Sequence, residues 1–131
     1  VIFDGNHACD LNLDDVNSGT ISQCSLAGGA SIGVKLFSSE DVDIEQTAIG
    51  GDAKVARAIM IHNSARTDIV ACRIGRADIA VTLQGGDTKQ TLIKQCRFGE
   101  PEENTCDLRV SLGAEEPTLE DNRPDQLKRC D

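Results

Sequence analysis

Apolar residues recur along this chain at a regular interval, and their spacing predicts its architecture. Five six-residue segments each begin and end with an apolar residue and carry a small or amide residue in the fourth place; they are residues 21–26, 44–49, 69–74, 93–98 and 119–124. Successive segments begin 23 to 26 residues apart. A fixed period of this length is typical of a solenoid, in which each repeat forms one coil and stacks on the next.

A second set of short segments lies between the first, at residues 11–13, 34–36, 59–61, 81–83 and 110–112. In each, we expect the apolar first and third residues to face inward and the middle residue to face outward, as in a strand with one buried face. Stacking of the coils then predicts two inward columns. One is Ile21, Ile44, Ile69, Ile93 and Leu119, and the other is Leu13, Leu36, Ile61, Leu83 and Leu112.

Turn residues such as Gly50 with Gly51 and Gly85 with Gly86 separate the strands. Two short strands and their turns fill each period, so no room remains for a crossover helix. We therefore predict an all-β fold, a single-stranded right-handed parallel β-helix of about five coils with 22–29 residues per coil, over residues 1–124. Residues 125–131 form a tail that we expect to cap the last coil through Leu127. A leucine-rich repeat has a similar period, but its Leu-x-x-Leu-x-Leu frame is missing.

The repeat resembles the coils of the pectin-lyase-like β-helix superfamily, which often read Ile-x-x-Asn-x-Ile followed by Gly-Ile-x-Ile. The opening Val1-Ile-Phe-Asp-Gly-Asn6 is similar to an Ile-Asp-Gly-Asn segment found early in many members. The resemblance covers nearly the whole chain, but its motifs are generic to the fold and indicate no particular member. It implies a domain that binds or processes carbohydrate, with an acidic polysaccharide as the favoured ligand.

Composition narrows the choice of partners. The chain has 131 residues and a formal charge of −9, with no run of Lys and Arg, which argues against nucleic acid and anionic membranes as partners. No apolar stretch reaches the roughly 18 residues that a spanning helix needs. Three Phe and no Trp or Tyr leave no spare rings for a stacking platform.

Three arginines share one outward column, which reads Ser25, Ala48, Arg73, Arg97 and Arg123. Guanidinium groups stacked about 4.8 Å apart repel each other unless anions neutralise them. A carboxylate or sulfate ligand would do so, and so would nearby acidic residues such as Glu45 and Glu120. Both readings remain open at this point.

A second outward column reads Asp14, Phe37, His62 and Gln84, beside the outward Lys35. His62 and Lys35 are candidate contacts for sugar hydroxyls or acidic groups, although a solvated histidine fits the pattern as well.

Asp14, Asp15, Asp41 and Asp43 are the nearest approach to an acidic cluster, and members of the superfamily use such clusters to bind calcium or to cleave polyuronides. They lie at strand ends and turns, where Asp is common for local hydrogen bonding. The sequence shows no pair of carboxylates in register in the middle of a strand. We therefore expect no catalytic set, no metal and no cofactor, with calcium as the one ion to consider. If the protein is an enzyme, the resemblance implies a polysaccharide lyase or a glycoside hydrolase.

Six cysteines favour an oxidising, extracellular or cell-surface setting, although buried thiols need none. Cys24, Cys72 and Cys96 share an inward position and read as small core residues. A Cys72–Cys96 disulfide between adjacent coils stays open, as does the state of Cys9. Cys106 and Cys130 are one period apart and could pin the tail.

The repeat frame places Phe3 in register with Leu26, so the first coil begins inside a strand at Val1. Such an open end predicts a neighbouring segment or a partner subunit that covers it. The alternative function is therefore a non-catalytic structural module, as in an adhesin or a phage tail-spike-like protein, that assembles through its coil ends into a homo-oligomer or a longer β-helix.

Overall fold

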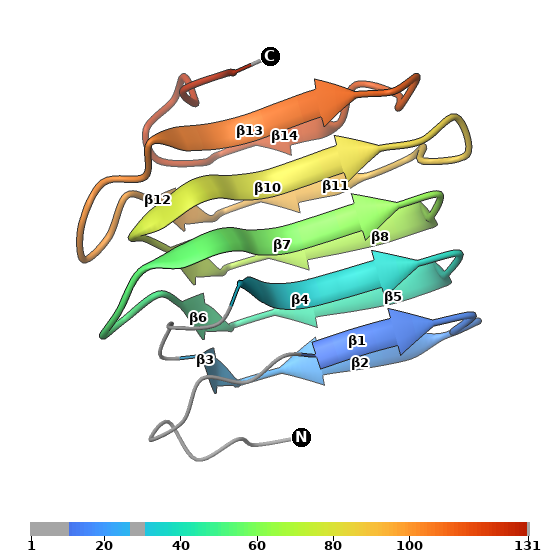
Figure 1. The fold of residues 1–131 in the computed structure, drawn as a ribbon, viewed down its shortest axis with the longest axis horizontal. Helices are drawn as coiled ribbons and strands as arrows, with labels where there is room; N and C mark the ends of the chain where they lie inside the picture. The colour runs from blue at the N-terminus through green and yellow to red at the C-terminus, as the bar shows by residue number, and fades with distance from the viewer. Residues whose placement is uncertain (1–10, 27–30, 131) are drawn as a thin grey trace.

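Strands of three kinds alternate along the chain, and each pairs in parallel with its counterpart in the next coil (Figure 1). The computed structural model of the protein describes residues 11–26 and 31–130. Within these residues the regular secondary structure consists of strands alone, and every pairing between strands is parallel. The repeat predicted from the sequence is therefore confirmed as a parallel β-solenoid.

Three sheets line the solenoid. The front sheet comprises β1 (Leu11–Asp14), β4 (Ile32–Phe37), β7 (Val55–His62), β10 (Ala77–Gln84) and β13 (Cys106–Ser111). The back sheet comprises β2 (Gly19–Ser22), β5 (Glu40–Glu45), β8 (Ala65–Val70), β11 (Leu92–Lys94) and β14 (Thr118–Glu120). The short side sheet comprises β3 (Ser25–Leu26), β6 (Ala48–Ile49), β9 (Arg73–Ile74) and β12 (Arg97–Phe98).

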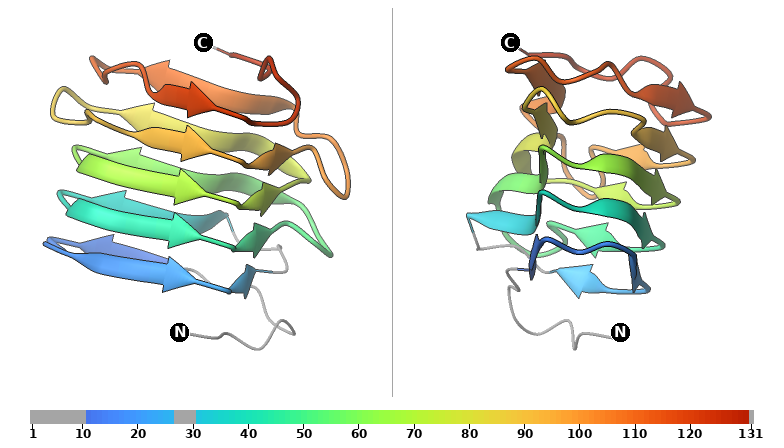
Figure 2. Two further views of the ribbon diagram at one scale, coloured as in Figure 1. Left: turned by 180° about the vertical axis from the view of Figure 1, so that it is seen from behind. Right: turned by 90° about the vertical axis from the view of Figure 1, so that its right-hand side faces the viewer.

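The coils wind in a right-handed sense. In Figure 1 the front strands run from left to right, the back strands return from right to left, and the chain climbs from the N-terminal to the C-terminal end. Figure 2 shows the same climb from behind and from one side, where the stacked coils enclose a narrow interior. The predicted handedness is confirmed.

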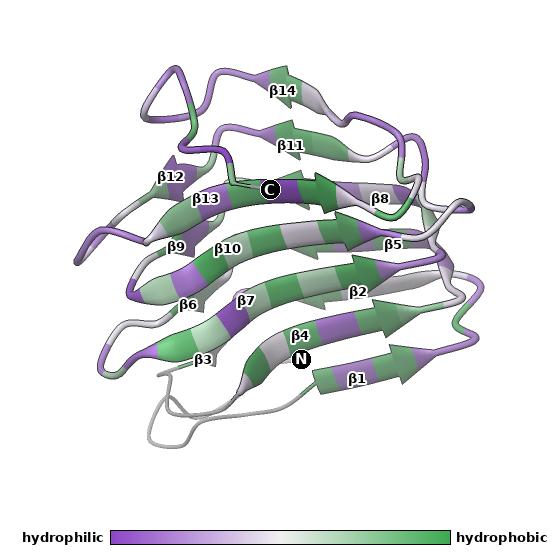
Figure 3. Ribbon diagram, turned by 45° about the horizontal axis from the view of Figure 1, so that its top comes forward, coloured by the Kyte–Doolittle hydropathy of each residue, from purple (hydrophilic) through white to green (hydrophobic). Residues whose placement is uncertain are grey.

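Apolar side chains fill that interior in columns. Ile21, Ile44, Ile69, Ile93 and Leu119 lie in register, as predicted, and the four isoleucines are buried. Leu119, in the last coil, is 41% exposed. Leu13, Leu36, Ile61 and Leu83 also lie in register, and in Figure 3 the hydrophobic positions recur from strand to strand across the front sheet.

The predicted register is wrong in the last coil. Leu83 pairs with Val110, and Val81 pairs with Leu108, so the strand is shifted by two residues from the expected 110–112. Leu112 is 72% exposed and has a φ of 52°. It occupies the corner where the front sheet turns into the back sheet, not the core column.

Single residues in the left-handed region make two of the corners. At the front-to-back corner these residues are Asp15, Ser38, Asn63, Gly85 and Leu112, with φ between 48° and 98°. At the back-to-side corner they are Gln23, Gln46, Ala71, Gln95 and Asp121, with φ between 48° and 54°. The same backbone bend therefore repeats in every coil, which keeps the flanking strands parallel.

Buried polar side chains satisfy the backbone at these corners. At the front-to-back corner Ser39 N donates to Ser64 Oγ at 3.1 Å, and Ser64 N donates to Thr88 Oγ1 at 3.3 Å. At the back-to-side corner Asn122 Nδ2 donates to the Ile93 carbonyl, and Asn122 Oδ1 accepts from Cys96 N, both at 2.9 Å. Paired in this way, the groups avoid the cost of a buried donor or acceptor without a partner.

The C-terminal tail lies over the last front strand. Lys128 N donates to the buried Asp107 carboxylate at 2.9 Å, and Cys130 N donates to the Leu108 carbonyl at 3.2 Å. A Cys106–Cys130 disulfide closes the same contact, and Leu127 is buried. The opening 1–6 segment, Cys9 and the Gly28-Gly29 turn fall outside the described residues.

Gly50 and Gly51 provide a matched test of the stacking. Gly50 is buried with a φ of 81°, and a Cβ there would overlap the carbonyl oxygen of Gly75 in the next coil. Gly51 is exposed, and a Cβ there meets no atom within 4 Å. We expect Gly50→Ala to lower the free energy of unfolding by about 2 kcal/mol or more, and Gly51→Ala to change it little. Urea denaturation measures both; equal midpoints for the two variants would contradict the stacking at this corner.

Candidate functional site

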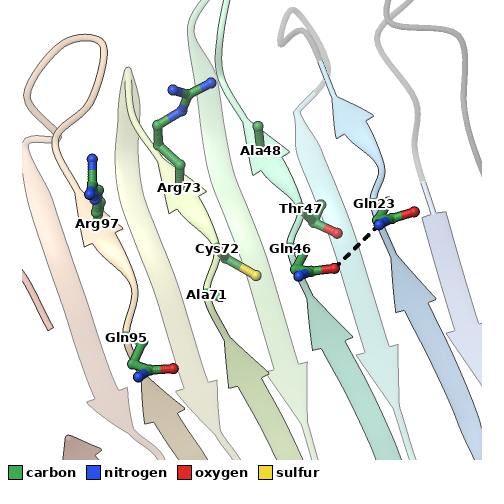
Figure 4. A pocket seen from close by; sticks show the side chains of 9 residues that line it. All are labelled: Gln23, Gln46, Thr47, Ala48, Ala71, Cys72, Arg73, Gln95 and Arg97. Carbon is green, nitrogen blue, oxygen red and sulfur yellow. Dashed lines mark hydrogen bonds between the residues drawn. The ribbon is translucent and has the colours of Figure 1, made fainter. Parts of the chain in front are cut away.

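A groove of about 520 Å³ lies outside the corner where the back sheet turns into the side sheet (Figure 4). Gln23, Gln46, Ala71 and Gln95 contribute its corner wall. Ala48, Arg73 and Arg97 line it from the side sheet, and Thr47 and Cys72 lie beneath. We call this feature the amide–arginine groove.

The glutamines line the groove because of the corner backbone. Each is the left-handed residue that immediately precedes an inward one, so its own side chain is left outside the coil. Gln23, Gln46 and Gln95 are all exposed. Gln23 Nε2 donates to Gln46 Oε1 at 3.4 Å across adjacent coils. The amides therefore offer both donors and acceptors along the solenoid axis.

The arginine column has the register predicted from the sequence. Ser25 pairs with Ala48, Ala48 with Arg73, and Arg73 with Arg97, which makes an isolated bridge with Arg123. Arg97 Nη1 lies 3.9 Å from Glu100 Oε2, and both side chains are exposed. Over residues 11–26 and 31–130, neither Arg73 nor Arg123 has a carboxylate within ion-pair distance.

The acidic residues expected to neutralise this column do not do so. Glu120 Oε2 lies 3.8 Å from Lys94 Nζ, and Glu45 makes no ion pair with an arginine of the column. Both belong to the outward column of the back sheet, on the other side of the corner. Since like charges opposite one another on neighbouring strands are destabilising, Arg73 and Arg97 gain from an anion bound between them.

The five predicted ligand residues divide among three places. Arg73 and Arg97 line the groove, and Arg123 lies one coil further along without lining it. Lys35 and His62 lie on the front sheet. The structure therefore brings two of the five together.

His62 is engaged by its neighbours on the front sheet. The predicted column of Asp14, Phe37, His62 and Gln84 is in register. Gln84 Nε2 lies 2.8 Å from His62 Nδ1, and the rings of Phe37 and His62 are 5.0 Å apart between centroids. These contacts account for the histidine without a ligand.

Sequence reasoning missed two cations on the front sheet. Arg109 is in register with Thr82, and Arg57 Nη1 lies 4.0 Å from Met60 Sδ. The shifted register of the last coil hid Arg109. Arg57 was hidden because the strand bends after it, where both Ala58 and Ile59 are buried and the alternation is lost.

The candidate calcium residues do not form one cluster. Asp14 and Asp15 end a front strand, whereas Asp41 and Asp43 lie on the back sheet. Arg66 Nε donates to Asp41 Oδ1 at 2.7 Å, and this bond lowers the pKa of Asp41. In the part of the chain that the structure describes, no three His, Cys, Asp or Glu residues gather as a metal site.

An in-register carboxylate pair is nevertheless present, contrary to the prediction. Asp43 lies directly opposite Asp68, because each precedes an isoleucine of the inward Ile44–Ile69 pair. Burial, followed by repulsion from Asp43 and Asp41, raises the pKa of Asp68. This pair lies on the back sheet outside the amide–arginine groove.

The inward cysteines read as core residues. Cys72 and Cys96 are buried and are not joined by a disulfide. Their mutual contact and burial raise the pKa of the Cys72 thiol, so it stays protonated and is a poor nucleophile.

Comparison with known proteins adds no relative. No family model matches the chain, and neither a curated protein nor a solved structure matches it. Among the described residues, no helix is found that could cross a bilayer.

The Asp43–Asp68 pair predicts a pH-dependent effect. The folded-state pKa of Asp68 is raised, so ionised Asp68 costs free energy of folding. This cost is absent at low pH, where the carboxyl is protonated in the folded and the unfolded protein alike, and it develops as pH rises through the folded-state pKa. Asp68→Asn should raise the free energy of unfolding by about 0.5 kcal/mol at pH 7 and leave it unchanged near pH 3. Urea denaturation at both values tests this, with the exposed Asp78→Asn as the control. A gain at pH 3 equal to that at pH 7 would rule out the repulsion.

Proposed function

We propose that this protein binds an acidic polysaccharide along the amide–arginine groove. The observation that carries the proposal is the in-register pair Arg73 and Arg97, exposed beside a column of glutamine amides. The planar guanidinium group matches a carboxylate or a sulfate through two parallel hydrogen bonds. The amides supply donors and acceptors for the hydroxyl groups of a sugar.

The groove follows the direction in which the coils stack, so its polar groups repeat at the coil spacing of about 4.8 Å. A linear polymer with repeating charged and hydroxyl groups fits such a lining better than a compact molecule does. The resemblance of the repeat to pectin-lyase-like β-helices supports the same ligand class. With a net charge of −9, the protein repels polyanions at long range, so affinity has to come from contacts made inside the groove.

The proposal is for binding rather than cleavage. Arg73, Arg97 and Cys72 are the titratable residues of the groove lining, and no carboxylate or histidine belongs to it. A glycosidase needs two carboxyl groups flanking the scissile bond, and a lyase needs a base near the sugar proton that it removes. The Asp43–Asp68 pair faces out from the back sheet and does not line the groove.

Replacement of the groove arginines tests the function. Arg73→Gln with Arg97→Gln should weaken binding of an oligogalacturonate or a sulfated oligosaccharide by about ten- to a hundredfold, because two charge-assisted contacts are lost. Isothermal titration calorimetry measures the affinity. Lys35→Gln with Arg57→Gln removes the same charge from the front sheet and should leave the affinity unchanged. Equal losses in both variants, or no binding by the unaltered protein, would contradict the proposal.

A structural module that assembles through its coil ends is the second candidate. The back sheet ends at β14, which pairs with β11 alone among the described strands, and its Leu119 is 41% exposed. The adjoining end of the front sheet differs, because the tail covers β13. An edge strand with free backbone groups can accept a further strand.

Sedimentation velocity at high protein concentration tests this second candidate. If β14 is an assembly edge, the protein should associate and Leu119→Lys should make it monomeric, since a charge on an edge strand blocks pairing. Leu112→Lys, at the exposed front-to-back corner of the same coil and outside its strands, is the control and should still associate. A monomeric unaltered protein would exclude assembly through β14.

A further inference from the structure

Ala71 interrupts the glutamine column that lines the amide–arginine groove. The corner position reads Gln23, Gln46, Ala71, Gln95 and Asp121 in successive coils. Gln23 and Gln46, on adjacent coils, are close enough for their amides to hydrogen bond. Gln46 and Gln95 are two coils apart, about 9.6 Å on the usual spacing, so the single methyl group of Ala71 leaves a gap between them.

The corner backbone does not require this gap. Ala71 has a φ of 54°, the same as Gln23 and Gln95, and Gln46 has 48°. A residue other than glycine in the left-handed region is strained, and alanine is not better suited to it than glutamine. Nothing in the local conformation therefore excludes a glutamine at position 71, and the small side chain leaves open space on the outer surface.

The gap lies beside the side-sheet strands that carry the two arginines of the groove. Figure 4 shows Ala71 between Gln46 and Gln95, with Arg73 and Arg97 on the neighbouring side sheet. Arg73 follows Ala71 by two residues in the same coil. Arg97 is the strand partner of Arg73 in the next coil. The buried Cys72 lies below. A cation pair, two flanking amides and a vacant corner position thus line the same groove.

We propose that the gap at Ala71 is the subsite that receives the charged sugar residue of the polysaccharide. This inference rests on the proposed function and assigns its specificity to one position. The carboxylate or sulfate of the sugar accepts hydrogen bonds from Arg73 and Arg97, while its hydroxyls meet the amides of Gln46 and Gln95. A glutamine at position 71 would complete the column and occupy the space that the ring needs.

A glutamine at position 71, which completes the glutamine column, tests whether the gap is the subsite. Ala71→Gln should weaken binding of a galacturonate hexasaccharide by at least about tenfold, because the sugar can no longer approach the arginines. Ala71→Ser keeps the gap, and serine already adopts a φ of 51° at position 38, so it should bind like the unaltered protein. Thermal unfolding of each variant shows whether the coil is intact. A sulfated hexasaccharide and an uncharged hexasaccharide, titrated alongside, distinguish a carboxylate from a sulfate and from no charge.

A second variant covers the case in which Ala71→Gln alters the groove indirectly. Ala71→Gln combined with Gln95→Ala moves the gap by one coil, to the level of Arg97, and should restore binding at least in part. No recovery in a folded double variant, or full binding by Ala71→Gln, would overturn the subsite.

The outcome remains distinct from that of the proposed function. If Ala71→Gln binds normally while Arg73→Gln with Arg97→Gln does not, the groove binds the glycan and the gap is not the subsite. If the unaltered protein binds none of the three hexasaccharides, the proposed function itself fails.

Discussion

Parallel hydrogen bonding between successive coils is the interaction on which the rest of this structure depends. Each strand pairs with its own counterpart one coil away, so every side chain lies on the side chain at the same position of the next repeat. A shift by one residue in any coil would turn the inward column outward. The left-handed corner residues follow from the same constraint, because parallel strands stay in register only if each coil bends at the same place.

The stacking of identical residues stabilises a buried apolar column but destabilises an exposed column of like charges. In the interior it brings isoleucine onto isoleucine, and these aliphatic side chains are buried together. On the surface it brings Asp43 onto Asp68 and Arg73 onto Arg97, where like charges repel. The aspartate pair can lose its repulsion by protonation at low pH, because burial and the neighbouring carboxylates raise the pKa of Asp68. Arginine does not lose its proton in this way. Glu100 lies within ion-pair distance of Arg97, whereas Arg73 has no carboxylate partner among the described residues, so a bound anion would relieve the repulsion that remains.

The period of the sequence predicted the fold and the register of most columns, because a buried face repeated five times leaves few alternatives. It failed in the last coil, where residues 108–112 alternate throughout and two registers, offset by two residues, bury equally suitable side chains. The tail decides between them by pairing with Leu108, and no local pattern reveals that contact. The arginine column was predictable from the frame. The glutamine column has a sequence signal, because each glutamine directly precedes an inward residue, but a search for buried positions does not consider it. That the glutamines lie near the arginines depends on the angle of the corner, which the sequence does not give.

The lengths of the corners explain why the groove forms where it does. Between the back and side strands every described coil has two residues, as at 23–24, 46–47, 71–72 and 95–96, whereas the side-to-front connection varies from two residues at 75–76 to seven at 99–105. The front-to-back connection varies as well, from two residues at 38–39 to seven at 85–91. Variation in repeat length is therefore absorbed at these two connections, and the back-to-side corner keeps one length throughout. Side chains on that corner and on the adjoining side sheet then stack with a constant offset, which is the condition for a straight groove that a polymer could follow across coils. A single substitution in such a regular column, as at Ala71, changes one subsite without disturbing its neighbours.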